Sequence, residues 1–308
     1  MLTLLSAPKP FQGHIGVIQA NAINSWLRLS PPCEVLLFGN EEGVAEAARR
    51  TGARHVPDVV RNRYGTPLLS DVFEQGAALA GTDLLCYVNA DIILLQDFAR
   101  AVQRVRERKA RFLMVGRRVD VVVDHDLPYD QTGWAEQFCT FVRSSGEPRG
   151  PEWIDYFVFP RGLYRGLPPF TLGRAGFDNW LLWRARSHGV PVVDASEAVL
   201  AIHQRHDYSH HAAGQKGVWE GAEAQENQAL MGGWHHCYTL ADATHRLTVR
   251  GLRRNLSLQY VRRRCRFAVM GAMHRTLAVR DRLGLRRSGR WWAWLRRMLG
   301  SAPQDRGR

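Results

Sequence analysis

The chain has 308 residues, enough for one large α/β domain with an appendage or for two modest domains. Its 42 Lys and Arg residues outnumber 29 Asp and Glu residues, which gives a formal net charge of +13. The charge is uneven: 18 Arg and only two acidic residues lie between Arg246 and Arg308, whereas the first 245 residues carry 24 basic and 27 acidic side chains. The composition therefore divides the chain into a nearly neutral N-terminal part, residues 1–245, and a cationic tail, residues 246–308.

The cysteines and the N-terminus exclude several classes of protein. Five cysteines are scattered without a CxxC pair, which argues against a disulfide framework and favours a reducing compartment. Met1–Ser6 has no basic region and too short an apolar run for a signal peptide. No window reaches the roughly 18 apolar residues of a membrane-spanning helix. We therefore expect a cytoplasmic protein, with peripheral attachment to the inner face of the cell membrane left open.

The front of the chain alternates strand and helix patterns. In chain order we predict a strand over Leu2–Leu5, a helix over Val17–Leu29, a strand over Glu34–Phe38, a helix over Glu41–Arg50, a helix from an N-cap at Thr66 to Gly81, a strand over Asp83–Asn89, a helix over Gln96–Lys109 and a strand over Phe112–Val115. This alternation predicts a doubly wound α/β sheet.

After residue 120 the alternation is less regular. The later predicted elements are a strand over Tyr156–Phe159, a helix over Asp178–His188, and short strands over Pro191–Asp194 and Val199–His203. The Arg-rich sequence from about residue 245 predicts one or two amphipathic helices, with Trp291, Trp292 and Trp294 near their end. We therefore expect one domain over residues 1–244 and a helical tail over residues 245–308.

Asp91 follows directly on the apolar strand pattern Leu84–Val88. In α/β sheets, ligands bind at the carboxyl ends of strands. A carboxylate there can hold a divalent cation, and the cation can bridge two phosphates. The alternative is that Asp91 only caps the following turn, and the residues of this segment alone do not decide between the two.

The run Cys86–Leu94, CYVNADIIL, resembles the DxD-bearing segment of GT-A fold nucleotide-sugar glycosyltransferases of the family 2 type. The match covers roughly residues 1–210 in element order. It implies a GT-A-like, Rossmann-like mixed sheet and a Mn²⁺ or Mg²⁺ ion held by Asp91. Asn89 stands where that family has its first acid, so the resemblance assigns Asn89 a contact to the ribose or to the water shell of the metal.

A Gly-rich loop delivers Asp178 to the start of a predicted helix in the segment Gly173–Leu181. Asp178 can be an ordinary first-turn acid. The resemblance instead assigns it the role of a general base that deprotonates an acceptor hydroxyl, as inverting transfer requires. Arg174 in the same loop is a candidate partner for a phosphate.

Four histidines and one aspartate lie between His203 and His211, just after a predicted strand. Imidazole is a common metal ligand. The resemblance points to His203 as a second metal ligand, and we place His206 with the donor-binding residues. A dinuclear zinc hydrolase would need an HxHxDH run, and both the spacing and the place in the chain differ. The third alternative is a polar loop with incidental histidines.

Four further stretches suit the donor. Lys9 and Gly13 follow the first strand, where the resemblance places the nucleobase and ribose, and Asn40 follows the second. Arg61 precedes a predicted helix start, which is a natural site for an anion. Asp155 is a candidate for hydrogen bonds to the hydroxyls of the donor sugar. The alternative is that Lys9, Gly13 and Asn40 only form ordinary turns after their strands.

The basic tail predicts contact with an anion. Arg attracts acidic lipids and Trp prefers the membrane interface, which favours an anionic membrane surface. Nucleic acid is the competing partner, although no RNA- or DNA-binding module is present. The third alternative is a solvated helical extension. A membrane tether would suit an enzyme that acts on a lipid-linked or envelope glycan.

Taken together, the motifs predict a hexosyl-type glycosyltransferase that takes a nucleoside diphosphate sugar, foremost a UDP-sugar, and a hydroxyl acceptor. A sugar-1-phosphate nucleotidyltransferase is the first alternative, although the Gly-rich opening expected of it is missing after the first strand. A non-enzymatic protein that binds membranes or nucleic acid through the tail is the second.

Overall fold

The computed structural model describes residues 1–206, 214–265 and 269. Residues 1–263 form one compact unit, and the remaining residues belong to a second. The strands are β1 (Thr3–Ser6), β2 (Glu34–Phe38), β3 (Arg54–Val56), β4 (Leu84–Val88), β5 (Ile92–Ile93), β6 (Leu113–Val121), β7 (Glu147–Pro148), β8 (Ile154–Pro160), β9 (Val192–Asp194), β10 (Ala201–Gln204), β11 (His245–Thr248) and β12 (Gly251–Arg254). The helices are α1 (Gly13–Leu27), α2 (Val44–Thr51), α3 (Leu69–Leu79), α4 (Gln96–Arg106), α5 (Trp134–Ser145), α6 (Phe177–Ser187), α7 (Gly214–Glu220) and α8 (Ala222–Met231), with short 3-10 turns η1 (Trp234–His236) and η2 (Leu240–Asp242).

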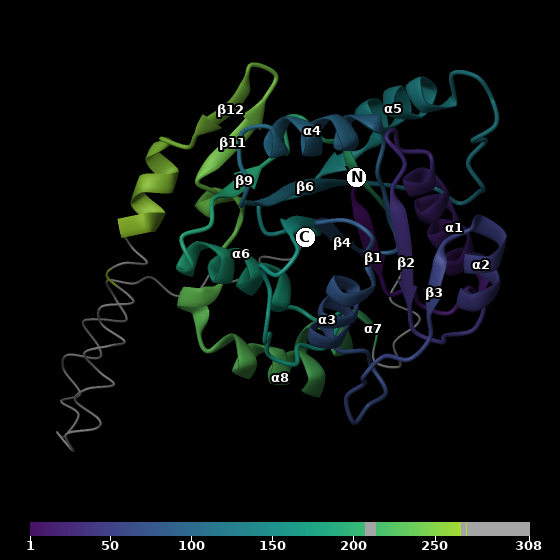
Figure 1. The fold of residues 1–308 in the computed structure, drawn as a ribbon, viewed down its shortest axis with the longest axis horizontal. Helices are drawn as coiled ribbons and strands as arrows, with labels where there is room; N and C mark the ends of the chain where they lie inside the picture. The colour runs from purple at the N-terminus through teal and green to yellow at the C-terminus, as the bar shows by residue number, and fades with distance from the viewer. Residues whose placement is uncertain (207–213, 266–268, 270–308) are drawn as a thin grey trace. The chain divides into compact units, whose positions relative to one another are not determined.

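A mixed sheet runs through the first unit, and its main path follows the order β12-β11-β9-β6-β8-β4-β1-β2-β3. β1 lies between β2 and β4 and is parallel to both, as expected of strands that are joined by helices. β8 is inserted between β4 and β6 and runs antiparallel to each. The prediction of a doubly wound, mixed α/β sheet is therefore confirmed (Figure 1).

Helices cover both faces of this sheet because successive side chains of a strand point to opposite sides. Leu4 belongs to a buried cluster with Trp26 of α1 and with side chains of α4. Leu5 belongs to the cluster on the other face, with Phe73 of α3 and with side chains of α6. Every residue of β4 is buried, as the continuous apolar run predicted.

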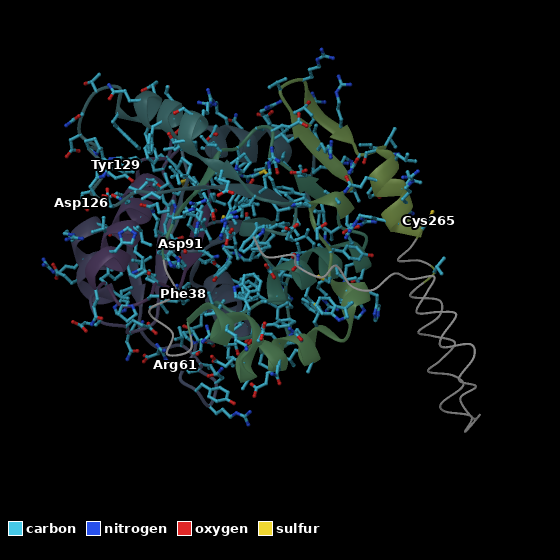
Figure 2. All side chains as sticks on the ribbon, turned by 180° about the vertical axis from the view of Figure 1, so that it is seen from behind. Phe38, Arg61, Asp91, Asp126, Tyr129 and Cys265 are labelled. Carbon is cyan, nitrogen blue, oxygen red and sulfur yellow. The ribbon has the colours of Figure 1, made fainter. Side chains whose placement is uncertain are left out.

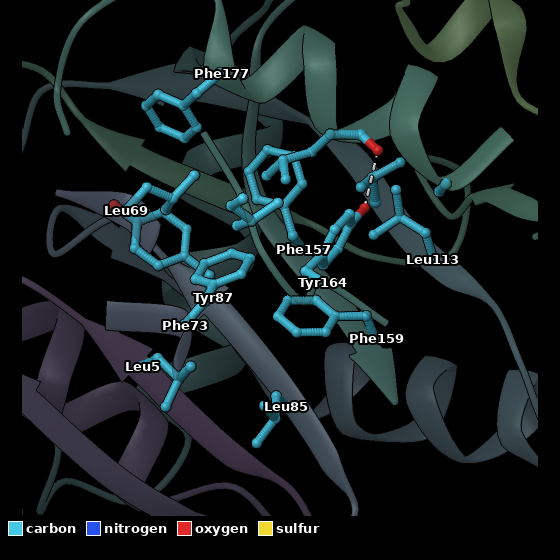
Figure 3. Close-up of a cluster of buried hydrophobic side chains, with 14 of the residues drawn as sticks. Leu5, Leu69, Phe73, Leu85, Tyr87, Leu113, Phe157, Phe159, Tyr164 and Phe177 are labelled. Carbon is cyan, nitrogen blue, oxygen red and sulfur yellow. Dashed lines mark hydrogen bonds between the residues drawn. The ribbon is translucent and has the colours of Figure 1, made fainter. Parts of the chain in front are cut away.

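An aromatic cluster supports the carboxyl end of β4 from one face (Figure 3). Phe73 stacks on Phe159 with ring centroids 5.0 Å apart and lies 5.7 Å from the ring of Tyr87. The ring of Tyr164 meets the ring of Phe159 edge-on, and its buried hydroxyl donates a hydrogen bond to the Leu181 carbonyl oxygen at 2.9 Å. Because the core is packed directly behind Tyr87, the residues that follow β4 leave the sheet from a rigid support.

β6 extends further than the predicted strand over Phe112–Val115 and changes partners along its length. Its first residues pair with β8 and β9, the register shifts between Val115 and Arg117, and the later residues pair with β10 and β7. A side chain at Gly116 would collide with the Tyr156 hydroxyl, so the irregularity sits where only glycine fits. The branch formed by β10 and β5 leaves the main sheet here.

The start of the basic tail differs from the prediction. Residues 245–254 were expected to be helical, but they form β11 and β12, and β11 pairs in parallel with β9. The reason is that Arg253 and Arg254 lie exposed on an edge strand, where charged side chains are favoured. Residues 258–265 are helical, and the three tryptophans of the tail lie outside the described residues. Among the described helices, none is both long and apolar enough to span a bilayer.

Candidate active site

Strand pairing brings the sequence-predicted residues Asp91 and His203 together. Asp91 lies in the tight turn between β4 and β5. In the short antiparallel pair of β5 and β10, His203 lies opposite Ile92, the residue next to Asp91. In the parallel pair of β10 and β6, the partner of His203 is Asp120. The register of two strand pairs thus places three chemistry-bearing side chains at one point, although they are far apart in sequence.

Asp91, His203 and His206 form a group of metal-ligand type, with one ligand atom of each within 4.8 Å of the others. The Asp91 Oδ2 atom lies 3.2 Å from His206 Nε2 and 3.7 Å from His203 Nε2. The other oxygen, Asp91 Oδ1, is buried and has no hydrogen-bond partner in the described structure. A buried carboxylate oxygen without a partner is costly, and a divalent cation would satisfy it. The group therefore fits a metal ion, and it includes His206, which the sequence analysis had placed with the donor.

Neighbouring groups keep Asp91 charged. Burial raises the pKa of Asp91, but the charge of His203, the hydrogen bond to His206 and the charge of Lys9 together hold this pKa well below its usual range. An ionised carboxylate is the form that ligates a cation.

A buried ionic network lies beside this group, and sequence reasoning missed it. Asp120 is 2% exposed, and its carboxylate contacts His203 Nδ1 at 3.2 Å, Arg118 Nε at 2.8 Å and Arg149 Nε at 2.7 Å. Arg118 is 8% exposed and also stacks over the Trp153 ring, 4.5 Å from its centroid. The available signal was the three charged residues Arg117, Arg118 and Asp120, which follow the strand predicted over Phe112–Val115 and precede the apolar residues Val121–Val123.

Asn89 and Asp155 bond to one another. Asn89 Nδ2 donates to Asp155 Oδ1 at 2.7 Å, and Arg118 Nη1 lies 3.3 Å from Asp155 Oδ2. Asp155 is 8% exposed, so its charge is balanced inside the protein. Asn89 therefore directs its amide group to a neighbouring carboxylate. Its contact to a ribose and that of Asp155 to a donor sugar stay predictions.

Asp178 lies in the first turn of α6 and accepts a hydrogen bond from the Gly176 backbone N–H at 3.2 Å. Burial raises its pKa to about 6, and the nearby negative charge of Asp155 adds to this effect. A carboxylate whose pKa lies near neutrality is suited to accept a proton. Burial also raises the pKa of Tyr87, and the charges of Asp91, Asp155 and Asp178 each contribute to that increase. The charges of all three carboxylates therefore act on the Tyr87 hydroxyl.

Lys9 faces the same region. Its backbone N–H donates to Gln19 Oε1 at 2.7 Å, and Gln19 Nε2 donates back to the Lys9 carbonyl oxygen at 2.9 Å. Burial lowers the pKa of Lys9, the Asp91 carboxylate opposes that shift, and the charge of Arg174 reinforces it. Gly13 is the first residue of α1 and is exposed, with a φ of +49°. The loop after β1 therefore contributes one ammonium group whose charge acts on Asp91.

Arg174, the residue expected to meet a phosphate, is paired within the protein. Its Nε donates to Glu223 Oε2 of α8 at 2.9 Å, and the two side chains are 11% and 10% exposed. Asn62 Nδ2 donates to the other oxygen of Glu223 at 2.7 Å. α8 therefore holds the loop around Arg174 in place, and a phosphate contact would require Arg174 to share or exchange this partner.

Arg61 and Asn40 lie together after β2 and β3. Arg61 Nη2 donates to Asn40 Oδ1 at 3.0 Å, and Arg61 Nη1 donates to Glu41 Oε1 at 2.8 Å. With Gln75 they line a shallow pocket, and in Figure 2 Arg61 lies at the periphery of the drawn side chains while Asp91 lies nearer their middle. The helix start expected at Thr66 is wrong, because α3 begins at Leu69 with Leu68 as its N-cap.

No protein-family model matches the sequence, and no curated protein sequence matches it. Among solved structures, the chain is similar to glucosyl-3-phosphoglycerate synthase from Mycobacterium tuberculosis, at 14% identity over 77% of this chain and 80% of that chain, with a TM-score of 0.46. A complex of the same synthase with Mn²⁺, UDP and glucosyl-3-phosphoglycerate has a TM-score of 0.44 at 14% identity, with the same coverage of both chains. TarS residues 1–349 from S. aureus are similar at 9% identity over 66% of this chain and 60% of that chain, with a TM-score of 0.43.

Proposed function

We propose that this chain is a glycosyltransferase that moves a sugar from a nucleoside diphosphate sugar to a hydroxyl acceptor. The observation that carries the proposal is the group of Asp91, His203 and His206, in which a buried carboxylate oxygen lacks a partner. These three residues would hold a Mn²⁺ or Mg²⁺ ion, which would offset the charge that develops on the departing diphosphate. A ligand set of carboxylate and imidazole placed at the carboxyl end of a strand suits such a donor.

The remaining residues of the site would perform the transfer itself. Asp178 takes the proton of the acceptor hydroxyl, the acceptor oxygen bonds to the anomeric carbon, and the bond from that carbon to the diphosphate oxygen breaks. The acceptor oxygen would attack the anomeric carbon from the face opposite the departing diphosphate, so the configuration inverts. The pKa of Asp178, raised by burial to about 6, gives it enough basicity while leaving it ionised at neutral pH. Lys9 would add positive charge to the group around Asp91, since its charge acts on the Asp91 carboxylate.

The proposal predicts that the protein consumes a nucleoside diphosphate sugar only with a divalent cation. UDP-sugars are the first donors to test, since similar solved structures hold UDP with Mn²⁺ or Mg²⁺. Release of UDP, measured by a coupled assay, should appear with Mn²⁺, disappear with EDTA and return when Mn²⁺ is restored. GDP- and dTDP-sugars serve as parallel donors. Formation of pyrophosphate from a nucleoside triphosphate and a sugar-1-phosphate would instead favour the nucleotidyltransferase.

We further propose that the enzyme contacts an anionic membrane through the surface around β12, where it would meet a lipid-linked or envelope acceptor. Between Ala243 and Arg263 the chain has no acidic residue. Arg253 and Arg254 are exposed there, and so are the apolar side chains Leu256, at 81%, and Leu258, at 64%. Exposed arginine beside exposed leucine suits the headgroup layer of an acidic bilayer. A cytoplasmic location stays a prediction.

Replacing Arg253 and Arg254 with glutamine should weaken binding to vesicles that contain phosphatidylserine by about 30-fold, because each arginine near an anionic surface contributes about 1 kcal/mol. Flotation of the full chain with these vesicles measures the effect, and vesicles of neutral lipid are the control. Equal binding of the variant and the wild type would reject this surface. If the variant loses binding to RNA while its binding to the vesicles is unchanged, nucleic acid is the partner.

A further inference from the structure

Asp120 contacts the ring nitrogen of His203 that does not face Asp91. His203 Nε2 lies 3.7 Å from Asp91 Oδ2, while Nδ1 lies 3.2 Å from Asp120 Oδ1. The His203 ring therefore has a carboxylate on each side. Because the side chain is only 9% exposed, water has little access to the ring. The Nδ1 contact is close but is not aligned as a hydrogen bond.

A neutral imidazole carries one proton, and the partner of one nitrogen decides which nitrogen keeps it. A carboxylate beside Nδ1 keeps the proton there and leaves the lone pair on Nε2. That lone pair is what a cation at Asp91 would need. We propose that Asp120 is a positioning residue, which holds His203 as the Nδ1–H tautomer with Nε2 presented to the Asp91 side. This inference rests on the proposed function for its catalytic meaning.

Two arginines keep Asp120 suited to this role. Arg149 Nε lies 2.7 Å from Asp120 Oδ2, and Arg118 Nε lies 2.8 Å from Asp120 Oδ1. Arg118 also reaches Asp155, which in turn accepts the Asn89 amide. The network therefore fixes the Asp120 carboxylate against rotation and connects both flanks of the Asp91 turn. A buried ion pair often adds little to the free energy of unfolding, because removing the charges from water is costly. The pairs of Asp120 with Arg118 and Arg149 therefore favour a role in positioning.

The tautomer of His203 gives a test that needs neither metal nor activity. Long-range ¹H–¹⁵N spectra of ¹⁵N-histidine protein, recorded at a pH at which the ring is neutral, distinguish the two tautomers. The chain has 12 histidines, and the signal that His203→Gln removes identifies the right one. We expect the Nδ1–H form in the wild type and a mixture or the Nε2–H form in Asp120→Ala and Asp120→Asn. An unchanged tautomer in both variants would overturn the inference.

Affinity for Mn²⁺ alone, measured by electron paramagnetic resonance, is the second readout. Removing a carboxylate behind a ligating histidine lowers metal affinity by about 10- to 100-fold. We expect that loss in Asp120→Ala, a smaller loss in the isosteric Asp120→Asn, partial recovery in Asp120→Glu, and unchanged UDP binding in EDTA. Asp242→Asn is the matched control, because Asp242 is 4% exposed and pairs with Arg263 away from the site.

The outcomes separate this inference from the proposed function. If His203→Ala loses Mn²⁺ affinity but Asp120→Ala keeps it, the metal site stands and the role of Asp120 is rejected. If the wild type does not bind Mn²⁺, the metal part of the proposed function fails, and the tautomer measurement still decides the role of Asp120. If Asp120→Ala does not fold, Asp120→Asn carries both readouts.

Discussion

Replacing Asp91 with asparagine should reduce kcat/KM for the donor by about 1,000-fold or more and should make the remaining rate independent of Mn²⁺. The change keeps the size of the side chain but removes its charge, and it leaves His203 and His206 without the carboxylate they face. A metal ion supplies several kcal/mol of charge stabilisation, and about 4 kcal/mol corresponds to a factor of about 1,000 in rate. Steady-state release of the nucleoside diphosphate, titrated with Mn²⁺, measures the effect.

Asp83 provides the matched control for this variant. It lies just before the opposite end of β4, its side chain is 93% exposed, and its nearest charged partner is Arg161 at 4.0 Å. Asp83→Asn should therefore leave the rate and its dependence on Mn²⁺ unchanged. If Asp91→Asn retains wild-type turnover with the same response to Mn²⁺, the assignment of this group as the metal site is wrong.

The sequence could predict the parts of the site that follow apolar strands. Leu84–Val88 is a continuous buried strand, so Asp91 had to emerge at its carboxyl end. His203 likewise lies in β10, close to the predicted strand end. Their proximity could not be read from periodicity, because it depends on the pairing of β10 with both β5 and β6. A one-residue slip in either pair would turn His203 to the other face.

The sequence could not predict residues whose burial depends on distant partners. Arg118 and Asp120 look like the polar end of a strand, yet both are buried. Asp120 and Asp155 supply the opposite charge for Arg118, and Arg118 and Arg149 supply it for Asp120. Arg174 is a natural phosphate ligand in isolation, but Glu223, which lies 49 residues later, pairs with it. A local sequence pattern predicts which face of a helix or strand a side chain lies on. Ion pairs between residues far apart in the sequence form only when the chain has folded, so the pattern does not predict them.

Asp178 has two possible roles in the structure, and activity as a function of pH separates them. As a helix-start acid it accepts the Gly176 N–H and contributes to stability only. As the general base it must be ionised to react. Burial raises its pKa to about 6, so kcat/KM should be constant above that pH and should fall about tenfold for each pH unit below it. A plot of kcat/KM against pH reports this group in the free enzyme.

Asp178→Asn should lower kcat by about 100- to 10,000-fold, abolish the inflection near pH 6 and leave donor binding intact, because the amide can still accept the Gly176 N–H but cannot take a proton. Asp97→Asn is the control for the helix-start role, since Asp97 holds the same second position in α4 and accepts the Phe98 N–H at 2.8 Å. If both variants lose stability equally and neither loses kcat, Asp178 is a capping residue. If only Asp178→Asn loses kcat together with the inflection, then the Asp178 carboxylate is the group that accepts the proton.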